Sequence, residues 1–214
     1  MQLHTDTRMK AIEETTNSAL HAIGFGLAIA ALVILVVHTS LYESTWHVVS
    51  VSIYGATLVL LYLASTLAHA FHATRAGHFL EICDRCAIYL LVAGTYTPFT
   101  LTILRGGWGW SLFGIVWGLA LLGIAFGVIS EQRFSSITCL LYLLMGWTVV
   151  IAIVPILRLF PPAALVWLPL GGIIYSGGVL LFLSQKLFHH TLWHASVLCG
   201  SACHFCAVLT IIYS

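Results

Sequence analysis

Apolar residues in this chain gather into seven long runs that are separated by short polar breaks. The runs cover roughly residues 18–39, 47–70, 81–103, 109–130, 136–157, 163–184 and 190–212. A helix needs about 20 apolar residues to cross the hydrocarbon core of a bilayer, and each run reaches that length. The pattern therefore predicts an all-α integral membrane protein, a bundle of seven transmembrane helices.

The polar breaks are too short to fold as separate domains. Membrane-spanning strands would be about ten residues long with alternating polar and apolar positions, and these runs are longer and continuously apolar. Short connections also make consecutive helices antiparallel neighbours. We therefore expect one seven-helix domain over residues 18–214, preceded by a short N-terminal segment over residues 1–17.

Basic residues are divided unevenly between the two sets of breaks. The N-terminal segment and the breaks on its side hold six of them: Arg8, Lys10, Arg75, Arg85, Arg133 and Lys186. The other side holds Arg105 and Arg158. Because Lys and Arg are enriched in cytoplasmic loops, we predict a cytoplasmic N-terminus and, with seven spans, a C-terminus outside.

The composition fits a protein whose main solvent is lipid. Hydrophobic residues make up 60% of the sequence and charged residues 7%, whereas soluble domains carry about 25% charged residues. The formal net charge of +1 gives no sign of nucleic-acid binding. Membrane lipids are therefore the expected partners, and the six cysteines, which lie mostly in the apolar runs, are interpreted as small buried hydrophobic residues.

Four ionisable residues lie near the ends of runs and are candidates for function. His69 ends the second run, Asp84 begins the third, and His190 and His194 begin the seventh. In the predicted topology all four lie at the cytoplasmic side, at one depth. Ionisable groups within membrane spans are rare and usually functional, so this convergence predicts a single site.

The spacing of these residues points to a metal. His190 and His194 share one helix face, about 6 Å apart along the axis, which is how one helix offers two imidazoles to one Zn2+. With His69 they form a set of three histidines that leaves a fourth position open, as in catalytic zinc sites. Asp84 would hydrogen-bond the water there or support a ligand histidine. Ser65, one turn before His69, would bond to that water, to an oxyanion or to the backbone.

Other metal-capable residues lie close in sequence to these candidates: His72, His78, His189, Cys83 and Cys86. On a helix the side chain of His189 would be turned by about 100° from that of His190, so it should point away from the predicted metal site. The two cysteines form a C-x-x-C pair, but no second pair follows. A single histidine in a membrane helix also has the simpler role of a hydrogen bond between helices, so these alternatives stay open.

The first run opens with polar residues at offsets of 0, 3, 4 and 7, which is one helical face: Glu14, Asn17, Ser18 and His21. Such a stripe should face the bundle interior at the cytoplasmic side. It would either join the helices by hydrogen bonds or take part in the site.

The fourth run carries two pairs of glycines four residues apart, Gly114 with Gly118 and Gly123 with Gly127. Pairs of this kind allow helices to approach closely, and we expect them to pack against a neighbouring helix. Association into a homo-oligomer remains a further expectation.

Four stretches in order along the chain resemble the hemolysin III proteins, the bacterial branch of the progestin and adiponectin receptor family. The opening stripe is similar to the E-x-x-N-x-x-x-H-x-x-G of that family, and Ser65 with His69 is similar to its S-x-x-x-H. Asp84 and the later Tyr96-Thr97-Pro98 resemble its third helix, and His190 with His194 resembles the H-x-x-x-H of its last helix. One departure is Ala68, where bacterial relatives commonly have an aromatic residue.

The resemblance implies seven spans in the bacterial plasma (inner) membrane. It also implies zinc bound by His69, His190 and His194, with a water next to Asp84 and Ser65. Relatives with this site include alkaline ceramidases, and bacterial members have been linked to haemolysis and membrane-lipid homeostasis.

Three functions follow as hypotheses. The first is a metal-dependent hydrolase of a lipid amide or ester. The second is a sensor or receptor of membrane state with structural zinc, and the third is a pore-forming hemolysin. An open fourth position on the metal favours the first, because structural zinc sites use four protein ligands.

Overall fold

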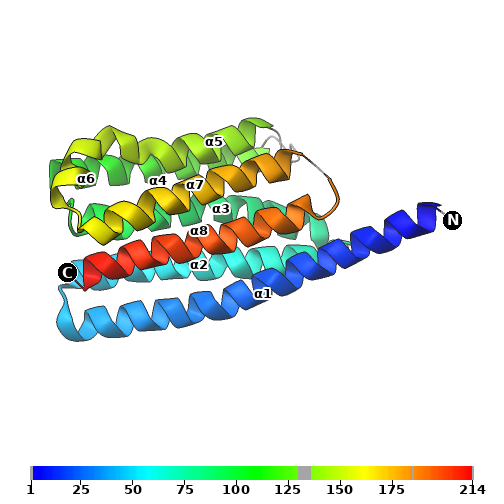
Figure 1. The fold of residues 1–214 in the computed structure, drawn as a ribbon, viewed down its shortest axis with the longest axis horizontal. Coiled ribbons are helices and arrows are strands. Elements are labelled where there is room, and N and C mark those ends of the chain that lie inside the picture. The colour runs from blue at the N-terminus through cyan, green and yellow to red at the C-terminus, as the bar shows by residue number, and fades with distance from the viewer. Residues whose placement is uncertain (1, 130–135, 185, 214) are drawn as a thin grey trace.

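A computed structural model describes residues 2–129, 136–184 and 186–213, and the regular elements in these ranges are helices. In chain order they are α1 (Gln2–Tyr42), α2 (Thr45–Ala70), α3 (Gly77–Leu101), α4 (Gly107–Ile129), α5 (Ser136–Gly146), the 3-10 helix η1 (Trp147–Ala152), α6 (Ile153–Leu159), α7 (Pro162–Leu183) and α8 (His189–Ile212). They run back and forth along one axis as a bundle (Figure 1). The predicted break that holds Arg133 lies outside the described residues.

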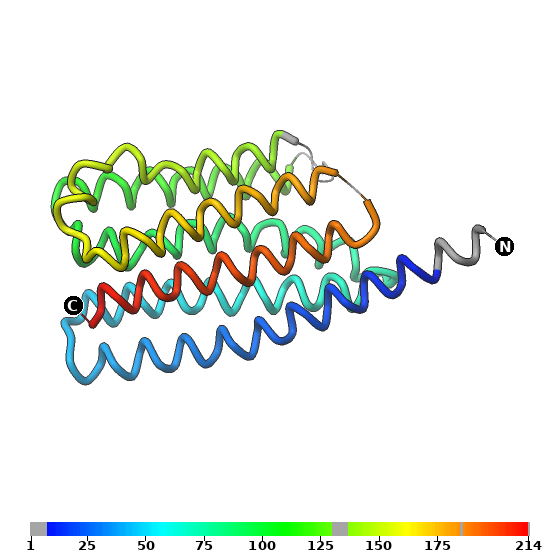
Figure 2. Tube along the Cα trace, in the orientation of Figure 1, coloured from blue at the N-terminus to red at the C-terminus, as the bar shows by residue number. Residues whose placement is uncertain are grey.

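The two ends of the chain lie at opposite ends of the bundle, and the beginning of α1 extends past the other helices (Figure 2). The predicted N-terminal segment is therefore continuous with the first span, since α1 is one helix from Gln2 to Tyr42. Helix α1 packs on α2, α2 on α3 and α3 on α4, while α8 packs on α7 and also contacts α1. The first and last helices are thus neighbours.

Six helical segments in the described ranges are long and apolar enough to cross a membrane: Arg8–Tyr42, Thr45–Ala70, Gly107–Ile129, Ile137–Leu159, Pro162–Leu183 and His189–Ile212. Helix α3 is of similar length but more polar. Its threonines are buried, and the hydroxyls of Thr95, Thr97 and Thr100 each donate to a carbonyl one turn earlier. These polar side chains of α3 are therefore covered by neighbouring helices and bonded to the backbone of α3 itself.

The predicted fifth run is one rod broken in its middle by the 3-10 helix η1. Pro155 has no N–H to bond to the carbonyl four residues earlier, and its ring crowds that turn, so a regular α-helix is interrupted there. At the other edge of the break the Tyr96 hydroxyl donates to the Gly146 carbonyl at 2.6 Å and accepts from the Val149 N–H at 2.8 Å. A side chain of α3 thus supplies the hydrogen bonds that the break leaves open.

The glycines of α4 mostly do not pack as the sequence led us to expect. Of the two predicted pairs, Gly123 is the member that lies against another helix in the described part of the chain, where an added Cβ would be 2.4 Å from the Tyr89 ring. At Gly114, Gly118 and Gly127 an added Cβ would meet nothing within 4 Å in the described part of the chain. The expectation of close packing within the bundle is wrong for these three, because their face of α4 points outward.

Candidate metal centre

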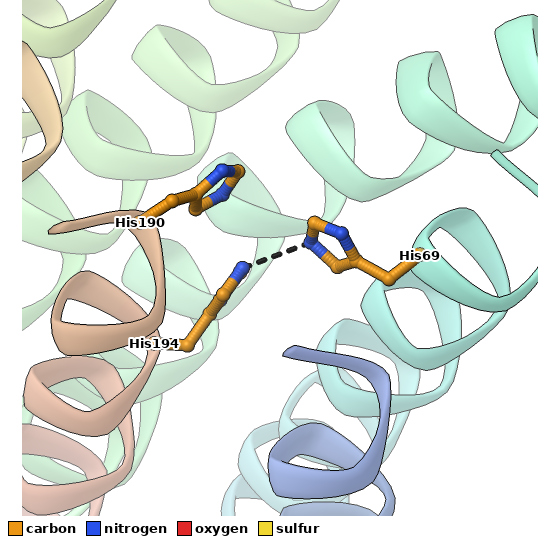
Figure 3. Close-up of side chains that lie close together, drawn as sticks. All are labelled: His69, His190 and His194. Atoms are coloured by element: carbon orange, nitrogen blue, oxygen red, sulfur yellow. Dashed lines mark hydrogen bonds between the residues drawn. The ribbon is translucent and has the colours of Figure 1, made fainter. Parts of the chain in front are cut away.

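Three histidines from two helices converge at the end of the bundle where α2 ends and α8 begins. His69 lies in the last turn of α2, while His190 and His194 lie in the first two turns of α8. One ligand atom of each lies within 4.8 Å of the other two (Figure 3). Among the described residues this is the group of His, Cys, Asp and Glu side chains able to hold a metal ion.

The geometry of the three rings fits a tetrahedral metal. Zinc–nitrogen distances of about 2.0–2.1 Å put two ligand nitrogens of a tetrahedral ion about 3.4 Å apart. The His194 Nε2 and His69 Nε2 atoms are 2.8 Å apart, and the His190 ring stacks on that of His194 with centroids 4.5 Å apart. Small rotations of these side chains would therefore bring three nitrogens onto one ion.

The local sequence explains why the rings face one another. His190 and His194 are one turn apart, so they share a face of α8. Helix α8 begins immediately after Phe188, whose φ of 61° lies in the left-handed region, a conformation that costs a bulky residue of the order of 1–3 kcal/mol. The sharp turn at Phe188 allows the chain to enter α8 with both histidines in its first turns.

Ser65 and Asp84 lie next to the three histidines. Ser65 is buried one turn before His69, and its hydroxyl lies within reach of the Asp84 carboxyl. Asp84, which is partly buried in α3, lies close enough to Ser65 and His69 for both to act on its carboxyl electrostatically. A carboxyl group and a hydroxyl group thus flank the histidines.

The polar stripe of α1 faces the bundle interior, as the sequence predicted, and it borders the three histidines. The Glu14 Oε2 atom lies 2.6 Å from His69 Nδ1, and Thr191 Oγ1 donates to Asn17 Oδ1 at 2.6 Å. The His21 ring stands edge-on to that of His194, with centroids 4.1 Å apart. Thr191 was missed from the sequence, although its place between the two ligand histidines of α8 was a usable signal.

Residues 9–205 match the haemolysin-III-related family. This chain belongs to that family. It is similar to the hemolysin-3 homolog of Bacillus subtilis (strain 168), with 45% identity over 198 residues, which covers 92% of this chain and 93% of the relative. It is 44% identical to the hemolysin-3 of Bacillus cereus over 198 residues, which covers 92% and 90% of the two chains.

A more distant relative is the human monocyte to macrophage differentiation factor, which is 26% identical over 208 residues, covering 94% of this chain and 85% of the relative. The family and the apolar helices together make this a multi-pass protein of the bacterial plasma membrane.

The other metal-capable residues that the sequence offered do not join the histidine cluster of this haemolysin-III-related chain. The His72 Nδ1 atom lies 2.9 Å from the His69 carbonyl, and the His189 ring is hydrogen-bonded to Ser184. His78 and the two cysteines, Cys83 and Cys86, are not part of the metal-capable group found among the described residues. The structure therefore brings together the three histidines that the spacing favoured.

An apolar cavity of about 330 Å³ lies between α3, the broken rod α5–η1–α6, α7 and α8. One end is formed by Leu61, Ile88 and Trp193. These residues lie within one helical turn of Ser65, Asp84 and His194 respectively. The other end is formed by Leu104, Leu112 and Phe160. The cavity thus extends from beside the histidines toward the opposite end of the bundle.

Proposed function

We propose that this member of the haemolysin-III-related family is a zinc-dependent hydrolase that cleaves a lipid amide or ester within the membrane and serves membrane-lipid homeostasis. The observation that carries the proposal is the cluster of three histidines, with Asp84 and Ser65 beside it. A 330 Å³ apolar cavity is lined by Leu61, Ile88 and Trp193, which lie within one helical turn of these residues. The apolar cavity suits the hydrocarbon chain of a lipid, and the polar residues beside it suit the amide or ester bond that is cleaved.

The topology that we propose has seven spans, with α3 crossing the membrane as well. The N-terminus is cytoplasmic and the C-terminus is outside. In support, α1 begins and α8 ends at opposite ends of the bundle, which requires an odd number of crossings. The histidines then lie at the level of the inner leaflet, and lipid enters laterally because the loops above them are short.

In this mechanism His69, His190 and His194 would hold the ion through one nitrogen each. When bound, zinc supplies Lewis acidity toward a carbonyl and acidifies a water molecule. Asp84 orients that water and takes its proton as oxygen adds to the carbonyl carbon. Ser65, whose hydroxyl lies beside Asp84, would hydrogen-bond the developing oxyanion. The carbon–nitrogen or carbon–oxygen bond then breaks, and Asp84 returns the proton to the leaving amine or alcohol.

The experiment that tests this function compares purified wild-type protein with Asp84→Asn in lipid. The substrates are a panel of ceramides, N-acyl amides and phospholipids. Asn keeps the size of Asp but cannot accept the proton, and general-base catalysis is typically worth about 10²–10⁴-fold. We therefore expect turnover to fall by that factor while zinc remains bound. Glu43→Gln, an exposed carboxylate that follows α1 at the opposite end of the bundle, is the control and should retain turnover.

If the fully zinc-loaded wild type turns over none of these lipids, the hydrolase proposal is wrong. In that case the sensor with structural zinc becomes the better hypothesis. Leakage of dye from vesicles, measured in the same preparations, tests the pore-forming alternative directly.

A further inference from the structure

The contact between Glu14 and His69 joins two helices at the metal centre. Glu14 lies in α1, 55 residues before His69, and its Oε2 atom is 2.6 Å from the His69 Nδ1 atom. The His69 side chain is 9% exposed and that of Glu14 is 29% exposed. A carboxylate that remains partly in water therefore reaches a buried imidazole.

This contact decides which nitrogen of His69 is available to a metal. A carboxylate is an acceptor, so Nδ1 must carry the proton, and in a neutral ring Nε2 then has the lone pair. Nε2 is also the atom that faces His194 in the cluster, 2.8 Å from its Nε2 (Figure 3). The hydrogen bond thus turns the correct atom of His69 toward the other two ligands.

We propose that Glu14 is a positioning residue that fixes the tautomer and orientation of His69 and thereby sets the metal affinity of the site. This inference rests on the metal-binding part of the proposed function, not on its hydrolytic part. Carboxylates commonly hold metal-ligating histidines in this way, and their loss typically lowers metal affinity by about 10–100-fold.

The simpler role for Glu14 is to fasten α1 to α2. Another contact already does this, because the Ser18 hydroxyl of α1 donates to the Thr66 carbonyl of α2 at 3.1 Å. Asn17 of α1 also accepts from Thr191, which fastens α1 to α8. The two roles differ in what they predict. A fastening contact stabilises the protein equally with and without metal, whereas a positioning contact changes the affinity for the metal itself.

The test uses full-length protein in lipid nanodiscs, stripped with a chelator and titrated with Zn2+ and with Co2+. For Glu14→Gln, which keeps the volume but removes the charge, we expect roughly tenfold weaker binding, and for Glu14→Ala up to about 100-fold. The d–d absorption of bound Co2+ should shift in both variants, because one ligand is no longer held in place. Glu13→Gln, next to Glu14 on the same helix but turned by about 100°, should match the wild type.

Equal zinc affinities for wild type, Glu14→Gln and Glu14→Ala would overturn the inference. So would a fall in unfolding temperature that is the same with and without metal, with unchanged affinity. A wild type that binds no metal would overturn both this inference and the proposed function. A wild type that binds metal but hydrolyses no lipid would end the hydrolase proposal alone.

Discussion

At the residue scale, the three histidines are not equivalent in their surroundings. His194 is 3% exposed, and its Nδ1 atom has no hydrogen-bond partner in the described ranges of the chain. The His21 ring beside it is 2% exposed, and likewise neither of its nitrogens is hydrogen-bonded within those ranges. His194 therefore lies deepest in the protein, where a polar ring without a ligand is costly.

Replacing His194 by Ala should remove metal binding, with a loss larger than the roughly 100-fold that supporting residues cause. Zinc at 100 times its dissociation constant should stabilise the wild type by about 2.7 kcal/mol, because it binds only the folded state, and should not stabilise the variant. Metal content and unfolding with and without zinc measure both effects. His72→Ala is the matched control, and metal loss in that variant with retention in His69→Ala would show that the wrong histidine was chosen.

The sequence predicted which residues form the site, but not all of the contacts between them. Apolar runs fixed the ends of α2 and α8 closely, so the sequence placed His69, His190 and His194 at one depth. It also placed Glu14 on an inward face. It did not pair Glu14 with His69, because that pairing depends on how two helices are rotated about their own axes, which no local pattern specifies.

At the scale of elements, a predicted run matches the observed helix closely where the helix and the apolar run share the same ends. The seventh run was predicted over residues 190–212 and α8 spans His189–Ile212. The first run was predicted from residue 18, but α1 begins at Gln2, since a helix can continue past the apolar part into water. The fifth run contains η1, which apolar composition does not reveal because a 3-10 and an α-helix need the same apolar length.

The Tyr96 hydroxyl should contribute to the stability of the broken rod. In Tyr96→Phe the Val149 N–H and the Gly146 carbonyl lose their partner, and an unsatisfied buried group costs about 1–3 kcal/mol. We expect the free energy of unfolding in mixed micelles to fall by that amount. Tyr42→Phe, at the exposed end of α1, is the control and should change it little. Equal stabilities for Tyr96→Phe and wild type would show that the break satisfies its own backbone groups.

At the scale of the whole molecule, aromatic side chains mark the end of the bundle opposite the histidines. Trp46 and Trp110 contact each other with ring centroids 5.8 Å apart, and the Arg105 guanidinium lies 5.0 Å from the Trp46 ring centroid. Tryptophans are enriched at membrane–water interfaces. This end therefore suits a membrane–water interface, which is the outer one in the proposed orientation.

The proposed orientation is tested by reporter fusions. A reporter after Ser214 should report the outside, and one inserted within residues 185–189 should report the cytoplasm, because an odd number of spans and the excess of basic residues on one side require it. Accessibility of single cysteines introduced at Trp108 and at Arg75, in a variant without the native cysteines, provides an independent measurement. Reporters on the same side would remove the seven-span topology.

The contacts that α8 makes with α1 and α2 also set an order for biogenesis. His69 and His194 are 125 residues apart, and Asn17 and Thr191 are 174 apart. At a synthesis rate of about 5–20 residues per second, α2 should wait in the membrane for roughly 6–25 s before α8 arrives. Metal uptake should therefore be a post-translational event that only a complete chain can achieve. A nascent chain that stops before α8 would lack His190, His194 and the Thr191 partner of Asn17, so the polar residues of α1 and α2 would have no helix to face.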